Sequence, residues 1–485
     1  MSSSSASSAT SVLQDLTMSH VGCAPGDTDS RHGEASNYLI PWLPEDIWCH
    51  IHSLMPMSDA ARAACLSRVF LHSWRCHPNL TLTWAILCPH GLELGQNIDR
   101  ILRNHTGIGL KTLELNLDDR DSLLPYVDSW LQVAIKPGLE MLILLLHKKY
   151  KFPCSLLSEG VRNSIRGLQL YACVFRPTSE LGPLRRLTSL DLSFVRITGD
   201  ELDCLLSNSL ALEQLELYSC KEIIFLKIPC VLQQLSRLTV IGCYRLQAME
   251  CNAPNLSIVF FSGRNIKLSL GQLMKMKELY MHQPDVVCYA RAELPSIMPN
   301  LETLVIGAGI EMVNVPMVLT KFLYLKHLTI EIWERTFSPP YDYFPLVSFF
   351  DASPALETFF MNVPLEDVKH ESVFGASSYL RELPEHQHNC LKVVEITGFS
   401  SAKSLVELTC CIVKNAVSLE CITLDTLRDR VRCYGEGNET CQPISNAVLK
   451  EASRTVMAIT MYIEDKVAPT CKLTVLEPCT RCHCR

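Results

Sequence analysis

The leucines of this chain return at one spacing, L-x-x-L-x-L, and this spacing restricts the fold more than any other feature. A clear copy is Leu187-Thr-Ser-Leu190-Asp-Leu192, and the next begins at Leu212. Alternate side chains of a strand share a face, so the second and third leucines point to one side and the intervening residue to the other. Burying three leucines contributes about 1.5–3 kcal/mol each, whereas ordering a unit costs about 1–2 kcal/mol per residue. One copy therefore cannot fold alone and must stack on its neighbours.

The same register begins at thirteen positions along the chain. They are Leu110, Leu139, Ile165, Leu187, Leu212, Leu235, Leu256, Met276, Leu301, Leu325, Leu356, Leu391 and Leu419. All but two of the steps between them match the period of about 20–29 residues that leucine-rich repeats have. The chain resembles irregular leucine-rich repeats, with Cys220 and Cys243 where an Asn or Cys is expected. We therefore expect an α/β solenoid, a horseshoe with a parallel sheet on its concave face, entered through a strand near residues 79–84.

Composition excludes several classes of protein. A chain of 485 residues is too long for one compact core, and it contains no run of eighteen apolar residues, so no membrane span is expected. The net charge of −7 gives no electrostatic reason to bind nucleic acid. The 23 cysteines are scattered through leucine-rich segments and no secretory stretch precedes them, which favours buried thiols in a reducing compartment, the nucleus and/or the cytoplasm.

The amino-terminal part of the chain separates into a tail and three short helices. Residues 1–36 are rich in Ser and Asp with little to bury, which indicates a flexible tail rather than an Arg-rich transit peptide. Ile47, Ile51 and Leu54 follow Pro44 with helical spacing, which predicts an amphipathic helix that Pro56 closes. A second helix is expected over 60–66, capped by Ser58 or Asp59, and a third from 69 to 74.

These helices resemble an F-box, the module that docks on the Skp adaptor of cullin-based ubiquitin ligases. The resemblance covers Leu43-Pro44-Glu45-Asp46-Ile47, Asp59-Ala60-Ala61, Ala64-Cys65-Leu66-Ser67-Arg68 and Trp74-Arg75, with Phe70 in place of the usual tryptophan. It implies that the adaptor contacts Leu43, Pro44, Ile47, Ile51, Leu54, Leu66 and Phe70. A module of about 35 residues is too small to stand alone, so it also fits a simple cap on the solenoid.

The residue between the last two core positions of each strand is expected on the open face of the sheet. This column is mostly polar or acidic in the first half of the chain, whereas Phe260, Tyr280, Val305 and Phe360 make it apolar in the second half. Exposed aromatic side chains on a concave sheet favour a surface for a target protein. The alternative is that the long inserts before Leu356 and Leu391 fold over this strip and bury it.

The carboxy-terminal repeats have a second resemblance. A strand over 390–397, a helix over 402–415 and a strand over 419–424 resemble the FBD region of plant F-box proteins with leucine-rich repeats. Beyond them, 447–450, 456–462 and 472–476 predict a short helix and two strands that close the array. The domains expected are the tail at 1–36, the F-box at 37–78, the repeat array at 79–387, the FBD-like repeats at 388–427 and a cap and tail at 428–485.

Catalytic and metal motifs give no positive indication. Cys479, Cys482, His483 and Cys484 have zinc-ligand spacing, but four ligands within six residues can hardly surround one ion, so no metal is expected. There is no phosphate-binding glycine loop and no nucleophile elbow. The resemblance implies a non-catalytic receptor without a cofactor, which recruits a target protein to an adaptor and, through it, to a cullin scaffold. The alternative is a leucine-rich scaffold or sensor that binds a partner or small ligand without a ligase.

Overall fold

The structure is a computed structural model. It describes residues 43–479 apart from 88–93, 108, 118–119, 147, 272, 309–319, 333–340, 365–370, 376–378, 382–386 and 428–443. The predicted tail at 1–36 lies outside these residues. The chain divides into two compact units, Met1–Ile223 and Ile224–Arg485. In the part of the chain that is described, no helix is long and apolar enough to cross a bilayer.

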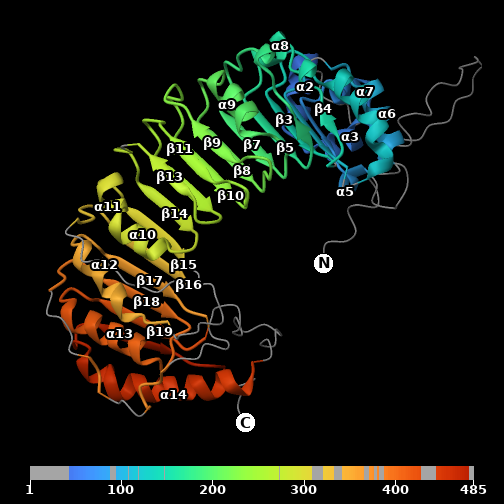
Figure 1. Ribbon diagram of the computed structural model, residues 1–485. Coiled ribbons are helices and arrows are strands. Elements are labelled where there is room, and N and C mark those ends of the chain that lie inside the picture. Colours follow the sequence, from blue (N-terminus) through green and yellow to red (C-terminus); the bar gives the residue numbers. More distant parts are fainter. Residues whose placement is uncertain are drawn as a thin grey trace, which may run out of the picture. The chain divides into compact units, whose positions relative to one another are not determined.

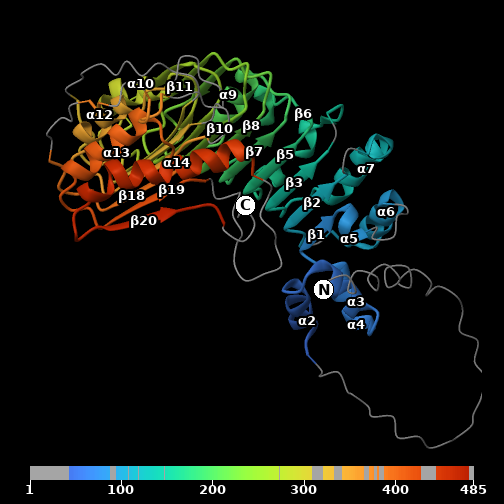
Figure 2. The ribbon, with the colours of Figure 1, turned by 90° about the horizontal axis from the view of Figure 1, so that it is seen from below.

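The first unit combines three amino-terminal helices with a parallel sheet in the order β1-β2-β3-β5-β7-β8 (Figures 1 and 2). The strands are β1 (Asn79–Leu82), β2 (Thr112–Asn116), β3 (Met141–Leu145), β5 (Gly167–Tyr171), β7 (Ser189–Ser193) and β8 (Gln214–Tyr218). A two-stranded sheet pairs β4 (Lys151–Phe152) with β6 (Val174–Phe175). The helices are α2 (Glu45–Ser53), α3 (Met57–Ala64), α4 (Arg68–Arg75), α5 (Trp84–Leu87), α6 (Leu94–Asn104), α7 (Leu124–Ala134), α8 (Glu159–Arg162) and α9 (Gly199–Ser207), with short η1 (Asp121–Leu123), η2 (Cys154–Leu156) and η3 (Ser179–Leu181).

The second unit continues the repeat with parallel strands in the order β10-β12-β14-β15-β16-β17-β18-β19-β20. They are β10 (Arg237–Ile241), β12 (Ile258–Ser262), β14 (Glu278–His282), β15 (Thr303–Ala308), β16 (His327–Ile332), β17 (Thr358–Asn362), β18 (Val393–Thr397), β19 (Cys421–Asp425) and β20 (Lys472–Leu476). A second sheet joins β9 (Phe225–Ile228), β11 (Ala248–Cys251) and β13 (Lys267–Leu270). The helices are α10 (Val286–Ala292), α11 (Leu294–Ile297), α12 (Val347–Ala352), α13 (Lys403–Asn415) and α14 (Asn446–Tyr462), with η4 (Phe344–Leu346) and η6 (Glu464–Lys466).

The predicted repeat register is confirmed at all thirteen starts. Each start residue is buried and precedes a strand that pairs in parallel with its neighbours; for example, Leu190 lies opposite Leu215 and Leu279 opposite Leu304. Strands alternate buried and half-exposed residues, as in the pattern of Ser189–Ser193. The buried residues form the interior of the α/β solenoid, and the half-exposed ones form its open face.

Cysteine replaces asparagine in holding one coil to the next. The Cys220 thiol, at a position where the repeat pattern led us to expect an Asn or Cys, is buried and donates to the Leu192 carbonyl of the neighbouring strand at 3.2 Å. Burial alone raises the pKa of the Cys173 thiol to about 12, so this thiol stays protonated. The cysteines in the described residues form no disulfide.

Two expectations about helices are wrong. The second helix begins at Met57, after Pro56, so neither Ser58 nor Asp59 caps it. Residues 447–462 form the single helix α14, and the strand expected over 456–462 does not exist. Its run of Thr, Val and Ile suggested a strand, but Ala452, Thr455 and Ile459 are buried with helical spacing, and packing of that face overrides propensity.

Candidate functional site

The three amino-terminal helices form a small module with one buried face. Helix α4 packs on both α2 and α3, and α3 contacts β1. The buried residues of these helices are mostly small or aromatic: His52, Met57, Ala60, Ala61, Ala64, Ser73 and Trp74. Alanines allow close approach of helix α3, so the module is sealed against the first strand of the array instead of standing alone.

A buried histidine ties this module to the sheet. The His77 ring places Nδ1 2.7 Å from the Asn79 carbonyl oxygen and Nε2 3.2 Å from that of Met55, which lies between α2 and α3. His105 Nε2 in turn lies 2.9 Å from the His77 carbonyl oxygen. Because Asn79 begins β1, these contacts fix the turn between two helices of the module relative to the first strand.

The predicted adaptor-binding residues make none of these contacts, although Leu54 directly precedes Met55. Leu54 and Leu66 are 74% and 76% exposed, and Ile47 is 40% exposed. Pro44 is also exposed. None of the seven side chains is buried; the half-buried members are Leu43, Ile51 and Phe70.

Phe70 belongs to an aromatic cluster on this module. Its ring meets Trp48 edge-on at 4.7 Å and the His52 ring at 5.1 Å between centroids, which holds α4 against α2. Val69 is 44% exposed beside Phe70 and was missed from the sequence. Leu66 lies in the turn before α4, so helical spacing does not link it to Val69, and no sequence signal singles out Val69.

The apolar strip of the second unit has the predicted register. Phe260 lies opposite Tyr280 and Tyr280 opposite Val305 on neighbouring strands. Thr329 then separates Val305 from Phe360, so the strip is not continuous. The Phe260 and Tyr280 rings stack at 4.2 Å with 12° between planes, and Phe360 is 38% exposed.

The described parts of the inserts before Leu356 and Leu391 contact α13 and the residues just before it. Tyr343 donates its backbone N–H to Ser404 Oγ of the helix, and Val373 donates its backbone N–H to the carbonyl of Ser401, which precedes the helix. Arg381 donates to Glu407 in the middle of the helix. One residue of each insert, Tyr343 and Arg381, is thereby held to α13.

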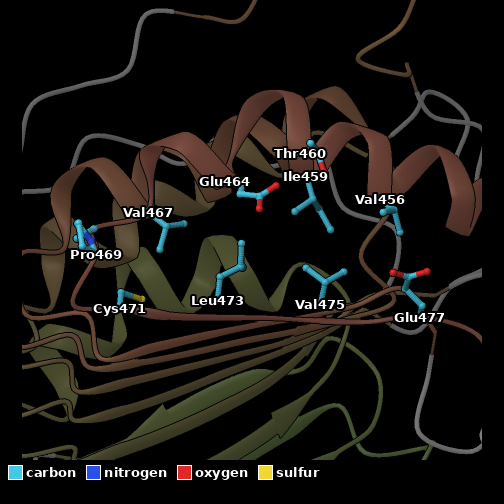
Figure 3. Close-up of a pocket in the computed structure, with 11 residues that line it drawn as sticks. Val456, Ile459, Thr460, Glu464, Val467, Pro469, Cys471, Leu473, Val475 and Glu477 are labelled. Atoms are coloured by element: carbon cyan, nitrogen blue, oxygen red, sulfur yellow. The ribbon is translucent and has the colours of Figure 1, made fainter.

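A hollow of about 430 Å³ lies between α14 and β20 (Figure 3). Ile459 of the helix and Val467, Leu473 and Val475 around the terminal strand line it. Glu464 and Glu477 add carboxylates.

The terminal cysteine cluster is only partly within the described residues. Cys479 is half-buried, whereas Cys482, His483 and Cys484 lie outside that range. Among the residues that can be placed, no group of three or more His, Cys, Asp or Glu could hold a metal ion.

Register, parallel pairing and the helical module together define a leucine-rich-repeat protein with an amino-terminal three-helix module. A family model described as "At1g61320/AtMIF1, LRR domain" matches residues 101–480. The chain belongs to this family.

Relatives from Arabidopsis thaliana support the resemblances found in the sequence. "Putative FBD-associated F-box protein At1g61330" is 22% identical over 81% of this chain and 92% of its own length. "Putative F-box/LRR-repeat protein At5g02700" is 28% identical over 37% of this chain, and the alignment spans only 38% of that relative. The resemblance to plant F-box, leucine-rich-repeat and FBD proteins is thereby confirmed.

Among solved structures, the functional domain of InlJ from Listeria monocytogenes is similar at 13% identity. The likeness covers 61% of this chain and 64% of that one, with a TM-score of 0.28. This score is too low to support an inference.

Proposed function

We propose that this protein is the substrate-recognition subunit of an SCF-type (Skp–cullin–F-box) E3 ubiquitin ligase. The three-helix module docks the Skp-family adaptor, and the open face of the repeats holds the target protein. The observation that carries the proposal is that α3 packs on β1 with Ala60, Ala61 and Ala64 buried, whereas the apolar side chains of Leu54 and Leu66 remain exposed. Large exposed leucines on a small module favour an interface.

The proposed contribution to ubiquitin transfer is proximity. The receptor binds the target and the adaptor at once, which raises the effective concentration of target lysines near the conjugating enzyme. Such a role needs no catalytic group on this chain. The contacts of His77 fix the module relative to β1, the first strand of the array.

Target binding is assigned to Phe260, Tyr280, Val305 and Phe360. Support comes from the stacked Phe260–Tyr280 pair on the open face and from Arg237, whose guanidinium lies 5.5 Å from the Phe260 ring centroid. The described parts of the inserts contact α13 through Tyr343 and Arg381. We place the complex in the nucleus and/or the cytoplasm, where buried thiols such as Cys173 stay reduced.

Adaptor co-purification tests the proposal. Leu54→Asp with Leu66→Asp introduces two charges at sites that are already exposed, so folding should be unaffected while adaptor binding is lost. Leu210→Asp is the matched control, because Leu210 is 57% exposed and lies outside the module. Retention of the adaptor by the double variant would exclude this docking face. A chain that never binds an adaptor would instead be a leucine-rich scaffold or sensor.

A further inference from the structure

Strand β3 presents an apolar row on the open face of the first unit. Met141, Ile143 and Leu145 are all half-exposed, and their neighbours Leu142 and Leu144 fill the interior. An open-face strand usually alternates buried apolar with exposed polar residues. This strand is apolar on both faces, so its open face exposes apolar surface to water. Binding of a partner would bury that surface.

An exposed aromatic pair borders this row. Tyr171 lies opposite Leu145 on the next strand and is 40% exposed. The ring of Phe194, 42% exposed, meets the Tyr171 ring edge-on at 5.1 Å. Aromatic side chains that keep this much surface in water are typical anchors of protein interfaces.

Phe194 has a strained backbone conformation. Its φ is +56°, in the left-handed region, and it directly follows β7. The same place after β5, β8, β10 and β18 also has positive φ, and it is occupied by Ala172 (+51°), Ser219 (+53°), Gly242 (+70°) and Gly398 (+71°). A bulky residue with positive φ is an outlier that costs about 1–3 kcal/mol. The other four residues are small, so the fold by itself does not account for an exposed phenyl ring at this place.

Two carboxylates stand on the same face without a cation. Asp191 and Glu216 are directly opposite on neighbouring parallel strands. Their hydrogen-bond donors are the Ser193 and Tyr218 hydroxyls, and no basic side chain in the described residues pairs with either acid. Like charges in this position are destabilising. Burial, and secondarily the Glu216 charge, raises the pKa of Asp191.

The spacing between row and carboxylates defines what can bridge them. Ile143, Gln169 and Asp191 are in register on three successive strands. Two strand spacings are about 10 Å. A segment in the extended polyproline II conformation advances about 3.1 Å per residue with three residues per turn, so its side chains three positions apart share a face. A segment crossing the strands would therefore place its side chains on Ile143 and Asp191 three residues apart.

We propose that this face binds an extended segment of the target protein with an apolar residue three positions from an arginine or lysine. The apolar side chain sits on the β3 row beside Tyr171 and Phe194, and the cation lies between Asp191 and Glu216. This inference rests on the proposed function in assigning the segment to the target. The contacts themselves require no adaptor.

Peptide binding to the full-length chain alone tests this. The probes are three labelled decapeptide pools with leucine fixed three positions before Arg, Gln or Glu, measured by fluorescence anisotropy. We expect the Arg pool to bind at least tenfold more tightly than the Gln pool and the Glu pool to bind most weakly. Equal affinities, or no measurable binding of the Arg pool, would overturn the proposal.

Two variants separate the parts of the site. Asp191→Asn with Glu216→Gln should reduce the Arg-over-Gln preference to less than twofold, and the melting temperature should stay the same or rise because the repulsion is gone. Phe194→Gly should weaken all three pools and keep the Arg preference. Glu159→Gln with Glu180→Gln removes the same net charge from other exposed positions and should change nothing.

Each outcome bears on one claim. If the control double variant loses the preference as strongly, net charge and not this site would explain it, and the proposal would be wrong. Failure of adaptor co-purification would leave these peptide affinities untouched, so the two proposals fail separately.

Discussion

Arg381 donates from Nε to Glu407 across 2.7 Å, and the accepting carboxylate is fully buried in α13. The same guanidinium donates to both carboxylate oxygens of Asp342 at 2.9 and 2.8 Å. One arginine thus fastens two segments that are far apart in sequence to a single helix.

Removal of Arg381 should therefore destabilise this helix. Arg381→Ala leaves Glu407 as an unpaired buried charge, for which a loss of about 3–5 kcal/mol is usual. Because the Arg381 side chain is 42% exposed and screened by water, we expect about 1–3 kcal/mol. Amide hydrogen exchange in α13 measures this loss. Glu407→Gln added to Arg381→Ala should recover part of it, and a double variant no more stable than Arg381→Ala would contradict the pairing.

Gly398 should be irreplaceable at the turn after β18. A Cβ there would lie 2.1 Å from the Val363 carbonyl oxygen, and φ is +71°. Gly398→Ala should cost at least about 2 kcal/mol, since strain and a backbone clash add together. Gly109→Ala is the control: φ is +76° with no atom within 4 Å, so about 1 kcal/mol is expected. Local hydrogen exchange compares them, and equal losses would show that φ alone matters.

Glycine should be better than alanine at position 194. Both substitutions remove the phenyl ring, so their difference isolates the backbone. At most sites glycine is about 0.5–1 kcal/mol worse than alanine. At a φ of +56° we expect the order to reverse, with Phe194→Gly more stable than Phe194→Ala by about 0.5–1 kcal/mol. Urea unfolding of the two variants decides it, and a more stable alanine variant would show that the strain is absent.

Acid should weaken the amino-terminal module. Burial lowers the pKa of His52, as does the nearby His77, and burial lowers the pKa of His105. Below about pH 6.5 these imidazoles therefore bind protons in the unfolded chain while they stay neutral in the folded chain. The stability is complete above that pH and is lost as pH falls through 6.5 toward the lowered folded pKa values. The melting temperature between pH 7.5 and 5 should fall, and His52→Gln should make the fall shallower; an unchanged slope would exclude His52.

The sequence determined the repeat register by itself. An apolar triplet that recurs at a near-constant interval can bury all its leucines when the strands stack in parallel with the leucines inside. Each strand start from Leu110 to Leu419 could therefore be predicted from spacing alone. The same logic placed Phe260, Tyr280 and Phe360 on the open face. The helices of the module followed from apolar spacing and the flanking prolines, whereas the predicted cap at Ser58 or Asp59 was wrong because α3 begins earlier, at Met57.

Only the tertiary structure decided which surfaces remain open. The inserts carry no spacing rule, and their place on α13 depends on Arg381 meeting Glu407, residues 26 apart in sequence. Helix α14 lies where a strand was expected. Its buried side, which includes Ile459, depends on packing against distant segments, and the local sequence does not show this packing. Nothing in the residue type of Phe194 indicates a left-handed backbone. Its positive φ arises from the turn that the neighbouring coils impose. Local spacing specifies what is buried within a coil, whereas contacts between distant segments determine what is left exposed to a partner.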